Sequence, residues 1–180
     1  EGRLKVAEDA YLAELREKTA LFGDNSLPLV PVLKDLMQVY KHWGRVKFND
    51  ADRSIRRALK IEEDNLGRDH LDCAVTIVDI CVLHGYFGDY SNDDEALRQH
   101  AVAIRENTLG KDHPDTAEAV YWLGGYYYAT RKYSQAEPLF MRAIAIYEKT
   151  LGSHAKTADA INEFARLYYD QGQYTKAEPL

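Results

Sequence analysis

Histidines are the residues of this chain whose chemistry and spacing first suggest metal ligation or acid–base catalysis. His70, His113 and His154 each follow a Leu-Gly dipeptide and recur about 42 residues apart. In an array of stacked units, equivalent residues lie one whole unit apart, which is too far to share a metal ion. We therefore interpret these three histidines as parts of a repeated junction and predict no metal site.

Cysteine chemistry is equally limited. Cys73 and Cys81 lie eight residues apart within one predicted helix, a separation that makes a disulfide between them improbable. Two free thiols fit a reducing compartment, so we expect a cytoplasmic location. His84 and His100 fall within predicted helices, and we expect both to be structural.

Other arrangements that carry chemistry are missing from the sequence. It contains no CxxC motif, no phosphate-binding glycine loop and no recognisable nucleophile–base pair. The acidic run Asp93-Asp94-Glu95 is expected at a helix start, where negative charge interacts favourably with the helix dipole, and it lacks the further oxygen ligands of a calcium site. We predict that the protein is not an enzyme and needs no cofactor.

The composition narrows the range of partners. The 180 residues are 46% hydrophobic and 29% charged, with a net charge of −6. This acidic balance disfavours nucleic acid, and no apolar stretch approaches the 18 residues of a membrane span. The chain begins without Met and stops at Glu178-Pro179-Leu180 within a recognisable unit, so we expect it to be a fragment of a longer protein.

A repeat of slightly more than forty residues organises the sequence. The segments IEEDNLG, IRENTLG and IYEKTLG end at Gly67, Gly110 and Gly152, and a degenerate copy ends at Gly23. Self-similarity at this period indicates stacked supersecondary units. The predicted division is a single array over 1–180: a preceding second helix in 1–23, full repeats at 24–67, 68–110 and 111–152, and a truncated repeat at 153–180.

The unit from Gly110 to Gly152 predicts a helix hairpin. Pro114 suits the first position of a helix. The first apolar stripe then has the three- and four-residue steps of a helix: Val120, Leu123, Gly124 and Tyr127. Ser134 and Glu137 have the spacing of a capping box for a second helix, as do Thr175 and Glu178.

The same first-helix stripe occurs in the other units. Its members are Leu33, Leu36, Met37 and Tyr40; Ile77, Ile80, Cys81 and His84; and Ile161, Phe164, Ala165 and Tyr168. Second helices are expected at Asn49–Leu66, Asn92–Leu109 and Ser134–Leu151, with an earlier one at Val6–Leu21. The sequence thus predicts about eight helices and no strand.

These motifs resemble the tetratricopeptide repeat. Val120-x2-Leu123-Gly124-x2-Tyr127 followed by Ala136-x3-Phe140 is similar to its signature, with Val120 in place of the usual Trp. The longer period and the segment Leu109–Ala117 resemble kinesin light chain repeats. The resemblance implies an all-α, right-handed α-solenoid of stacked antiparallel helix hairpins that binds a peptide or protein partner in a concave groove.

In this family the first helices line the groove, which implies a set of binding candidates between the packing stripes. They are Lys34, Gln38, Lys41, Val78, Asp79, Val82, Tyr86, Glu118, Tyr121, Trp122, Gly125, Tyr128, Asp159, Asn162, Glu163, Arg166 and Tyr169. The aromatic members are expected to anchor a partner. The alternative is that some of these rings pack on the neighbouring hairpin.

The excess of carboxylates among these positions predicts a neutral or basic partner. Alternatively, several of the carboxylates only solvate the surface or pair locally. A second functional hypothesis is a structural, regulatory or self-associating scaffold arm of a multidomain protein, in which the repeats associate through exposed edges.

Overall fold

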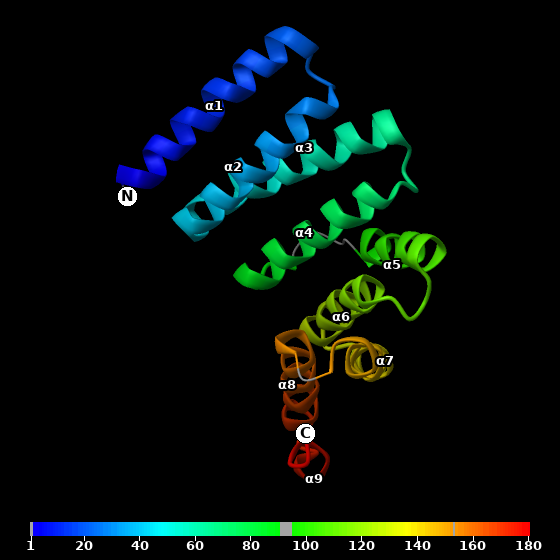
Figure 1. The fold of residues 1–180 in the computed structure, drawn as a ribbon. Coiled ribbons are helices and arrows are strands. Elements are labelled where there is room, and N and C mark those ends of the chain that lie inside the picture. Colours follow the sequence, from blue (N-terminus) through cyan, green and yellow to red (C-terminus); the bar gives the residue numbers. More distant parts are fainter. Residues whose placement is uncertain (1, 91–94, 153) are drawn as a thin grey trace. The chain divides into compact units, whose positions relative to one another are not determined.

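The computed structural model describes residues 2–90, 95–152 and 154–180, and all regular structure within them is helical (Figure 1). The expected all-α fold is therefore confirmed. The predicted helix start at Asn92 and the acidic residues Asp93 and Asp94 lie outside the described residues. The described elements are α1 Gly2–Phe22, the 3-10 helix Leu27–Leu29, α2 Val30–Trp43, the 3-10 helix Arg45–Lys47, α3 Phe48–Leu66, α4 Leu71–Phe87, α5 Glu95–Leu109, α6 Pro114–Ala129, α7 Tyr133–Leu151, α8 Ala155–Asp170 and α9 Tyr174–Ala177.

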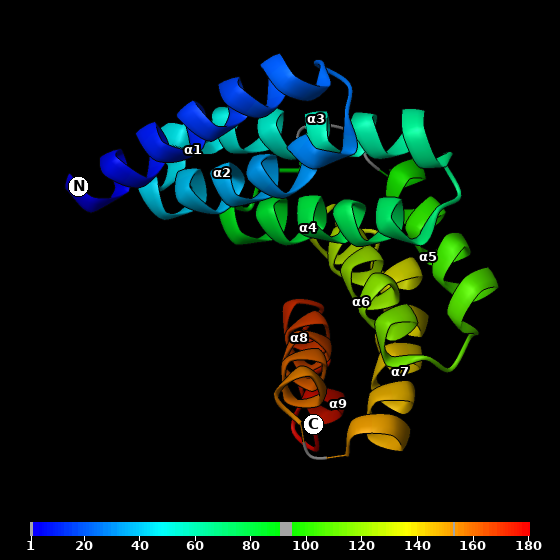
Figure 2. The ribbon, with the colours of Figure 1, turned by 45° about the horizontal axis from the view of Figure 1, so that its top comes forward.

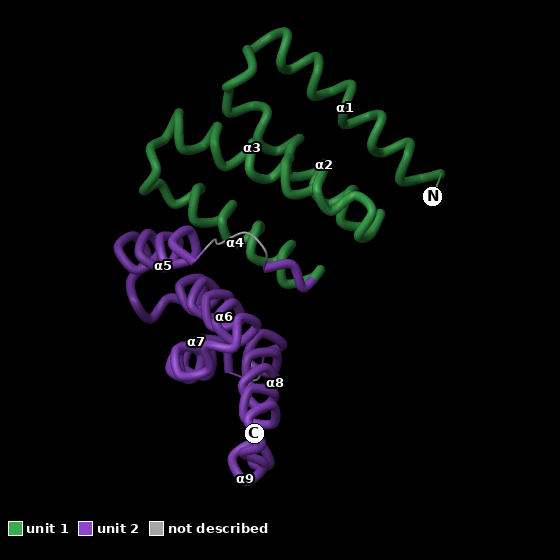
Figure 3. Tube along the Cα trace, turned by 180° about the vertical axis from the view of Figure 1, so that it is seen from behind, with its two compact units in different colours: residues 1–87 green, residues 88–180 purple. Residues whose placement is uncertain are grey.

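The helices form two compact units, Glu1–Phe87 and Gly88–Leu180 (Figure 3). The division falls between α4 and α5, within the predicted repeat 68–110. The predicted division of the sequence into five segments therefore remains a prediction, whereas the helix pairs inside each unit are observed.

In the first unit, α2 and α3 form an antiparallel hairpin around the turn at Gly44 (Figure 1). Helix α1 packs on α2, and α4 packs on α3. The predicted stripe of α2 forms the hairpin core: Leu33, Leu36, Met37 and Tyr40 are all at most 7% exposed. Burial of this apolar stripe, rather than helix propensity, accounts for most of the stability of such helices.

In the second unit, α6 and α7 form the corresponding hairpin, with α5 packed on α6 and α8 packed on α7 (Figure 2). Val120, Leu123 and Tyr127 of the predicted stripe are buried. Gly124 allows the two helices to approach closely, because a Cβ atom there would lie 3.3 Å from atoms of Leu139 and Phe140.

The three repeated histidines sit at the junctions between hairpins, as expected. In each case Nδ1 accepts a hydrogen bond of 3.2 Å from the backbone N–H two residues later, at the start of the next helix. The donors belong to Asp72, Asp115 and Lys156. These histidines therefore act as N-caps, which satisfy one of the otherwise unpaired N–H groups of a helix start.

A second hydrogen bond closes each junction. Thr116 Oγ1 donates to the carbonyl oxygen of Gly110 at 2.8 Å, and Thr157 Oγ1 donates to that of Gly152 at 2.9 Å. Cys73 Sγ makes the equivalent contact with Gly67 at 3.4 Å. Gly110 has φ of 95°, a left-handed conformation that ends the preceding helix. The thiol of Cys73 thus occupies the place of a threonine hydroxyl.

Both predicted capping boxes are wrong. Helix α7 begins at Tyr133 and α9 begins at Tyr174, so Ser134 and Thr175 lie inside their helices and neither caps one. The α7 helix begins early because the Lys132 carbonyl already accepts the N–H groups of residues 135 and 136. Glu137 instead has a partner in a neighbouring hairpin.

The partner of Glu137 is Tyr168. Their contact is one of three equivalent contacts, each between a second helix and the first helix that follows it. In each case a carboxylate pairs with the last ring of the apolar stripe, and we call these three the acid–ring contacts: Asp52–His84, Glu95–Tyr127 and Glu137–Tyr168, at 2.8, 2.8 and 2.7 Å. Each contact joins neighbouring helices within one compact unit. Each apolar stripe therefore ends in a polar contact with the preceding second helix.

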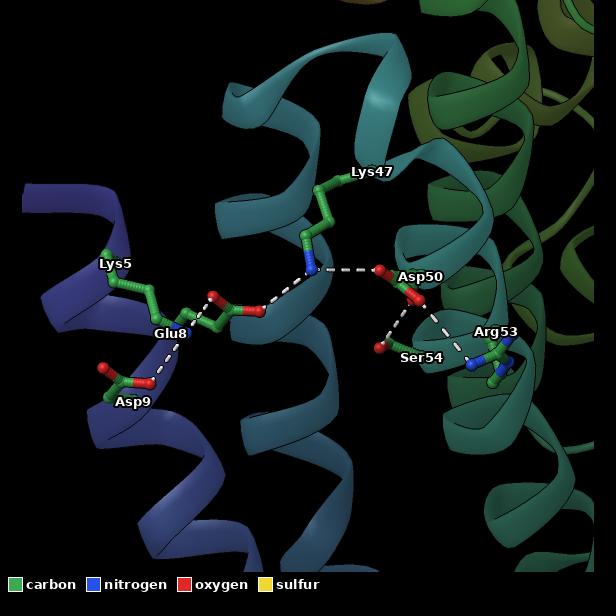
Figure 4. Close-up of polar contacts among 7 residues, drawn as sticks. All are labelled: Lys5, Glu8, Asp9, Lys47, Asp50, Arg53 and Ser54. Atoms are coloured by element: carbon green, nitrogen blue, oxygen red, sulfur yellow. Dashed lines mark hydrogen bonds and ion pairs between the residues drawn. The ribbon is translucent and has the colours of Figure 1, made fainter. Parts of the chain in front are cut away.

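Glu8 occupies the corresponding place in α1, beside Tyr40, and it is 5% exposed. Its carboxylate lies 3.0 Å from Lys5 Nζ and 3.2 Å from Lys47 Nζ, and Lys47 also contacts Asp50 (Figure 4). The hydrogen bond from Lys5, supported by Lys47, holds the pKa of Glu8 below its ordinary value despite burial. This cluster fixes α1 to the turn between α2 and α3.

Candidate partner-binding surface

In the first unit, side chains from α2 and α4 meet across their exposed faces. Lys34 Nζ lies 3.7 Å from Glu62 Oε1 and 3.4 Å from Asp79 Oδ2, and Lys41 Nζ lies 4.8 Å from the ring centroid of Tyr86. Glu62 is buried, which raises its pKa. These contacts bring together the predicted candidates of two first helices.

The resulting α2–α4 surface consists of Lys34, Gln38, Lys41, Asp79, Val82 and Tyr86. Tyr86 is its most prominent apolar feature, with 66% of its surface exposed. Val78 was also expected on it, but Val78 is 5% exposed and packs into the interior. Both charged candidates on α2, Lys34 and Lys41, contact side chains of α4. This surface therefore offers a partner one exposed aromatic ring and few charged groups that are not already in contact with another side chain.

In the second unit, α6 and α8 lie side by side and parallel. Near their N-terminal ends, Lys156 Nζ donates to Glu118 Oε1 at 2.8 Å. Near their C-terminal ends, Tyr128 Oη donates to Asp170 Oδ2 at 2.6 Å. Two contacts at opposite ends of the pair fix the register of α6 against α8.

Most of the predicted candidates of this unit lie between those two contacts. We call this region the α6–α8 surface, and it comprises Glu118, Tyr121, Trp122, Gly125, Tyr128, Asp159, Asn162, Glu163, Arg166 and Asp170. Tyr121 and Trp122 stack edge to face, with ring centroids 5.2 Å apart. A Cβ atom at Gly125 would meet nothing within 4 Å, so the helix backbone is open to approach at this point.

Tyr121 combines the two roles that the sequence left open. Its ring packs 5.9 Å from that of Phe140 in the core, and it also lines the exposed surface. Burial, followed by the nearby carboxylates of Glu163 and Asp159, raises the pKa of Tyr121 to about 12. Trp122 is half-buried and lies outside both core clusters of this unit, which leaves it better placed to contact a partner.

A pocket of about 240 Å³ opens on this surface. It is lined by Glu118, Tyr121, Trp122, Tyr147, Lys156 and Asp159. Tyr147 and Lys156 were missed by the sequence analysis. Tyr147 lies on α7, where its position beside Ile146 indicates only core packing, and Lys156 resembles any solvated cation at a helix start.

Ion pairs neutralise two of the carboxylates that were predicted to give this surface its negative charge. Glu118 receives both Lys156 and Arg105, the latter at 3.2 Å, and Arg166 binds Glu163 at 2.7 Å. The expectation that some carboxylates pair locally therefore holds for Glu118 and Glu163. Asp159 has no ion pair within the part of the chain that the structure describes.

A larger and shallower hollow, of about 640 Å³, lies between α8 and α9. Its walls include Asn162, Arg166, Tyr169 and Tyr174. The rings of Tyr169 and Tyr174 are 5.2 Å apart and at least 60% exposed. Tyr169 thus lies beside the α6–α8 surface, at its C-terminal end.

Within residues 2–90, 95–152 and 154–180, no three His, Cys, Asp or Glu side chains come together in a way that could hold a metal ion. Among the same residues, no helix has the length and apolarity that a membrane span requires.

Comparison with known proteins agrees with this architecture. Residues 95–149 and 118–180 match the tetratricopeptide repeat family. Among solved structures, the nearly identical TPR-like repeats of a Podosopora anserina protein described as a kinesin light chain share 21% identity with this chain, at a TM-score of 0.79 over 99% of this chain and 83% of that one. BtubC (BKLC) from P. vanneervenii also shares 21% identity, at a TM-score of 0.81 over 99% of this chain and 70% of that one. No curated protein sequence matches this chain.

Proposed function

Because residues 95–180 match the tetratricopeptide repeat family, we propose that the chain binds an extended segment of a partner protein on the α6–α8 surface. Such repeats are generally protein–protein interaction modules, and their family is a non-catalytic scaffold family. Solenoid repeats present binding surfaces along stacked helices.

One observation carries the proposal: the contacts Glu118–Lys156 and Tyr128–Asp170 hold α6 and α8 in parallel register. Between them lie the half-exposed Trp122, the open backbone at Gly125 and the 240 Å³ pocket. A preformed surface lowers the entropic cost of binding, and a rigid indole supplies the kind of contact that dominates interfaces.

The partner segment is expected to be neutral or basic. Among the described residues, Asp159 has no ion pair and Asp170 accepts a hydrogen bond only from the hydroxyl of Tyr128. The cations Lys156 and Arg166, by contrast, are already paired. An acidic segment could pair with these cations only by breaking existing ion pairs. A basic segment could pair with Asp159 and Asp170 without breaking any ion pair.

A direct test begins with selection of peptides from a random dodecamer library displayed on phage, using residues 1–180 as bait. Dissociation constants of the selected peptides are then measured by fluorescence anisotropy. We expect Trp122→Ala to weaken binding roughly tenfold or more, as at other aromatic anchors. The control is Met141→Ala, which removes a 54% exposed side chain on α7, outside the α6–α8 surface, and should leave affinity unchanged.

Failure to select any peptide, or equal affinity for wild type and Trp122→Ala, would contradict the proposal. A loss confined to Tyr86→Ala would move the site to the α2–α4 surface. Circular dichroism of each variant shows whether the fold is retained.

The self-association hypothesis rests on a separate observation. Val6, Leu21 and Phe22 of α1 are 70%, 68% and 56% exposed, which is unusual for large apolar side chains on one helix. Light scattering of wild type and a Leu21→Ser, Phe22→Ser variant would detect association through this helix. A monomer at all concentrations would remove this candidate.

A further inference from the structure

The pocket on the α6–α8 surface contains a polar group without an internal partner. Tyr147 lines the pocket although it is only 2% exposed. Its hydroxyl forms no hydrogen bond with any described residue, and the oxygen is not among the fully enclosed side-chain atoms that lack a partner, so it is accessible from the pocket. A hydroxyl in this position can accept a hydrogen bond from a group that enters the pocket.

The walls of the pocket are aromatic. Tyr121 and Trp122 contribute two rings held edge to face at 5.2 Å, and the contact between Tyr121 and Phe140 fixes the first of them. Indole and phenol faces attract cations, most strongly when the cation is partly removed from water. A planar cation can stack on the indole while its edge reaches polar atoms.

One carboxylate that lines the pocket remains available to a cation from outside. Glu118 is neutralised by Lys156 at 2.8 Å and by Arg105 at 3.2 Å, and the side chain of Arg105 is 4% exposed behind it. Asp159 is then the one lining carboxylate without a cation among the described residues. An entering cation would pair with Asp159 without breaking an existing ion pair.

We propose that this pocket binds the guanidinium group of an arginine side chain carried by the partner segment. Guanidinium is planar, stacks on aromatic rings and has five N–H donors, enough to reach both the Asp159 carboxylate and the Tyr147 hydroxyl. An ammonium group matches this combination less well because it cannot stack. The inference rests on the proposed function, since it names the chemistry that the α6–α8 surface recognises.

The test uses the two tryptophan indoles as reporters. The indole N–H signals of Trp43 and Trp122 are separated by nitrogen-15 NMR and assigned with a Trp122→Phe variant. The probe is an acetylated, amidated Gly-Ala-Arg-Ala-Gly peptide. The matched control replaces arginine by citrulline, which keeps the shape and loses the charge.

The arginine peptide should shift the Trp122 signal saturably and leave that of Trp43 in place. Citrulline should bind at least about fivefold more weakly. Asp159→Asn should weaken the arginine peptide about threefold to tenfold and abolish the preference over citrulline. The matched control Asp112→Asn changes an exposed carboxylate outside the α6–α8 surface and should do neither. Tyr147→Phe should weaken binding with the fold intact by circular dichroism.

Equal shifts with arginine and citrulline, or an affinity unchanged by Asp159→Asn, would overturn the inference. The phage-selected peptides separate the two proposals. If the selected peptides bind through Trp122 but contain no arginine, and Asp159→Asn leaves their affinity unchanged, the proposed binding surface is supported and the arginine pocket is refuted. If neither the selected peptides nor the arginine peptide binds, both proposals fall.

Discussion

The hydroxyl of Tyr168 in α8 donates a hydrogen bond of 2.7 Å to Oε1 of Glu137 in α7. Tyr127 makes the same bond to Glu95, one repeat earlier. The two phenols are 41 residues apart and the two carboxylates 42, so the contact follows the sequence repeat. It links the second helix of one hairpin to the first helix of the next.

Loss of this bond should destabilise the second unit. Tyr168→Phe keeps the buried ring and removes the hydroxyl, so we expect a loss of about 1–2 kcal/mol in the free energy of unfolding. Urea denaturation measures it. A double-mutant cycle with Glu137→Gln should give a coupling energy of similar size. Additive effects of the two substitutions would show that the contact contributes nothing.

Stability should fall in alkaline solution. Burial and the Glu137 carboxylate raise the pKa of Tyr168 to about 12, against about 10 in the unfolded chain. The folded form keeps a proton that the unfolded form loses, so this contribution is complete below about pH 10 and disappears as pH rises toward about 12. Urea midpoints at about pH 9 and pH 11 check it. The decline should be smaller in Tyr168→Phe, and an equal decline would contradict the assignment.

Two adjacent glycines should respond oppositely to substitution. Gly124→Leu would force a side chain against Leu139 and Phe140, at a cost of about 1–3 kcal/mol. Gly125→Ala adds a methyl group in open space on the same helix and should stabilise by about 0.5–1 kcal/mol. Thermal melts distinguish them, and a neutral Gly124→Leu would refute the close packing of α6 and α7.

The junction histidine of α6 should contribute as an N-cap. His113→Ala removes the acceptor for the N–H of Asp115 and should destabilise by about 1 kcal/mol. His113→Asn supplies a side-chain oxygen in its place and should retain most of the stability. Urea denaturation of both variants decides this, and equal losses would mean that the ring acts by packing alone.

Cys73 should be unreactive while the protein is folded. Burial, helped by the nearby carboxylate of Glu62, raises the pKa of its thiol to about 11, which leaves little thiolate near neutral pH. Iodoacetamide at about pH 8 should label Cys73 only after denaturation, as mass spectrometry would show. Rapid labelling of the native protein would contradict the burial of this junction.

The sequence was sufficient to predict the helices and their packing stripes, because Val120, Leu123 and Tyr127 obey the helical period. It also predicted the junction role of His113 from its recurrence. It did not reveal the partner of Glu137, since a carboxylate three residues after a serine also fits a capping box. Long-range pairs such as Glu118–Lys156 have no local signal at all, and they became visible only once α6 and α8 were placed side by side.

The acid–ring contacts also affect how local unfolding of one hairpin spreads to its neighbours. Each contact contributes to the coupling between neighbouring hairpins rather than to the intrinsic stability of one, as in a linear chain of interacting elements. Strong nearest-neighbour coupling suppresses fraying of a single hairpin. Within the second unit, weakening of the Glu137–Tyr168 link should therefore lower the cooperativity of unfolding and allow α8 to exchange its amide protons before α6 and α7.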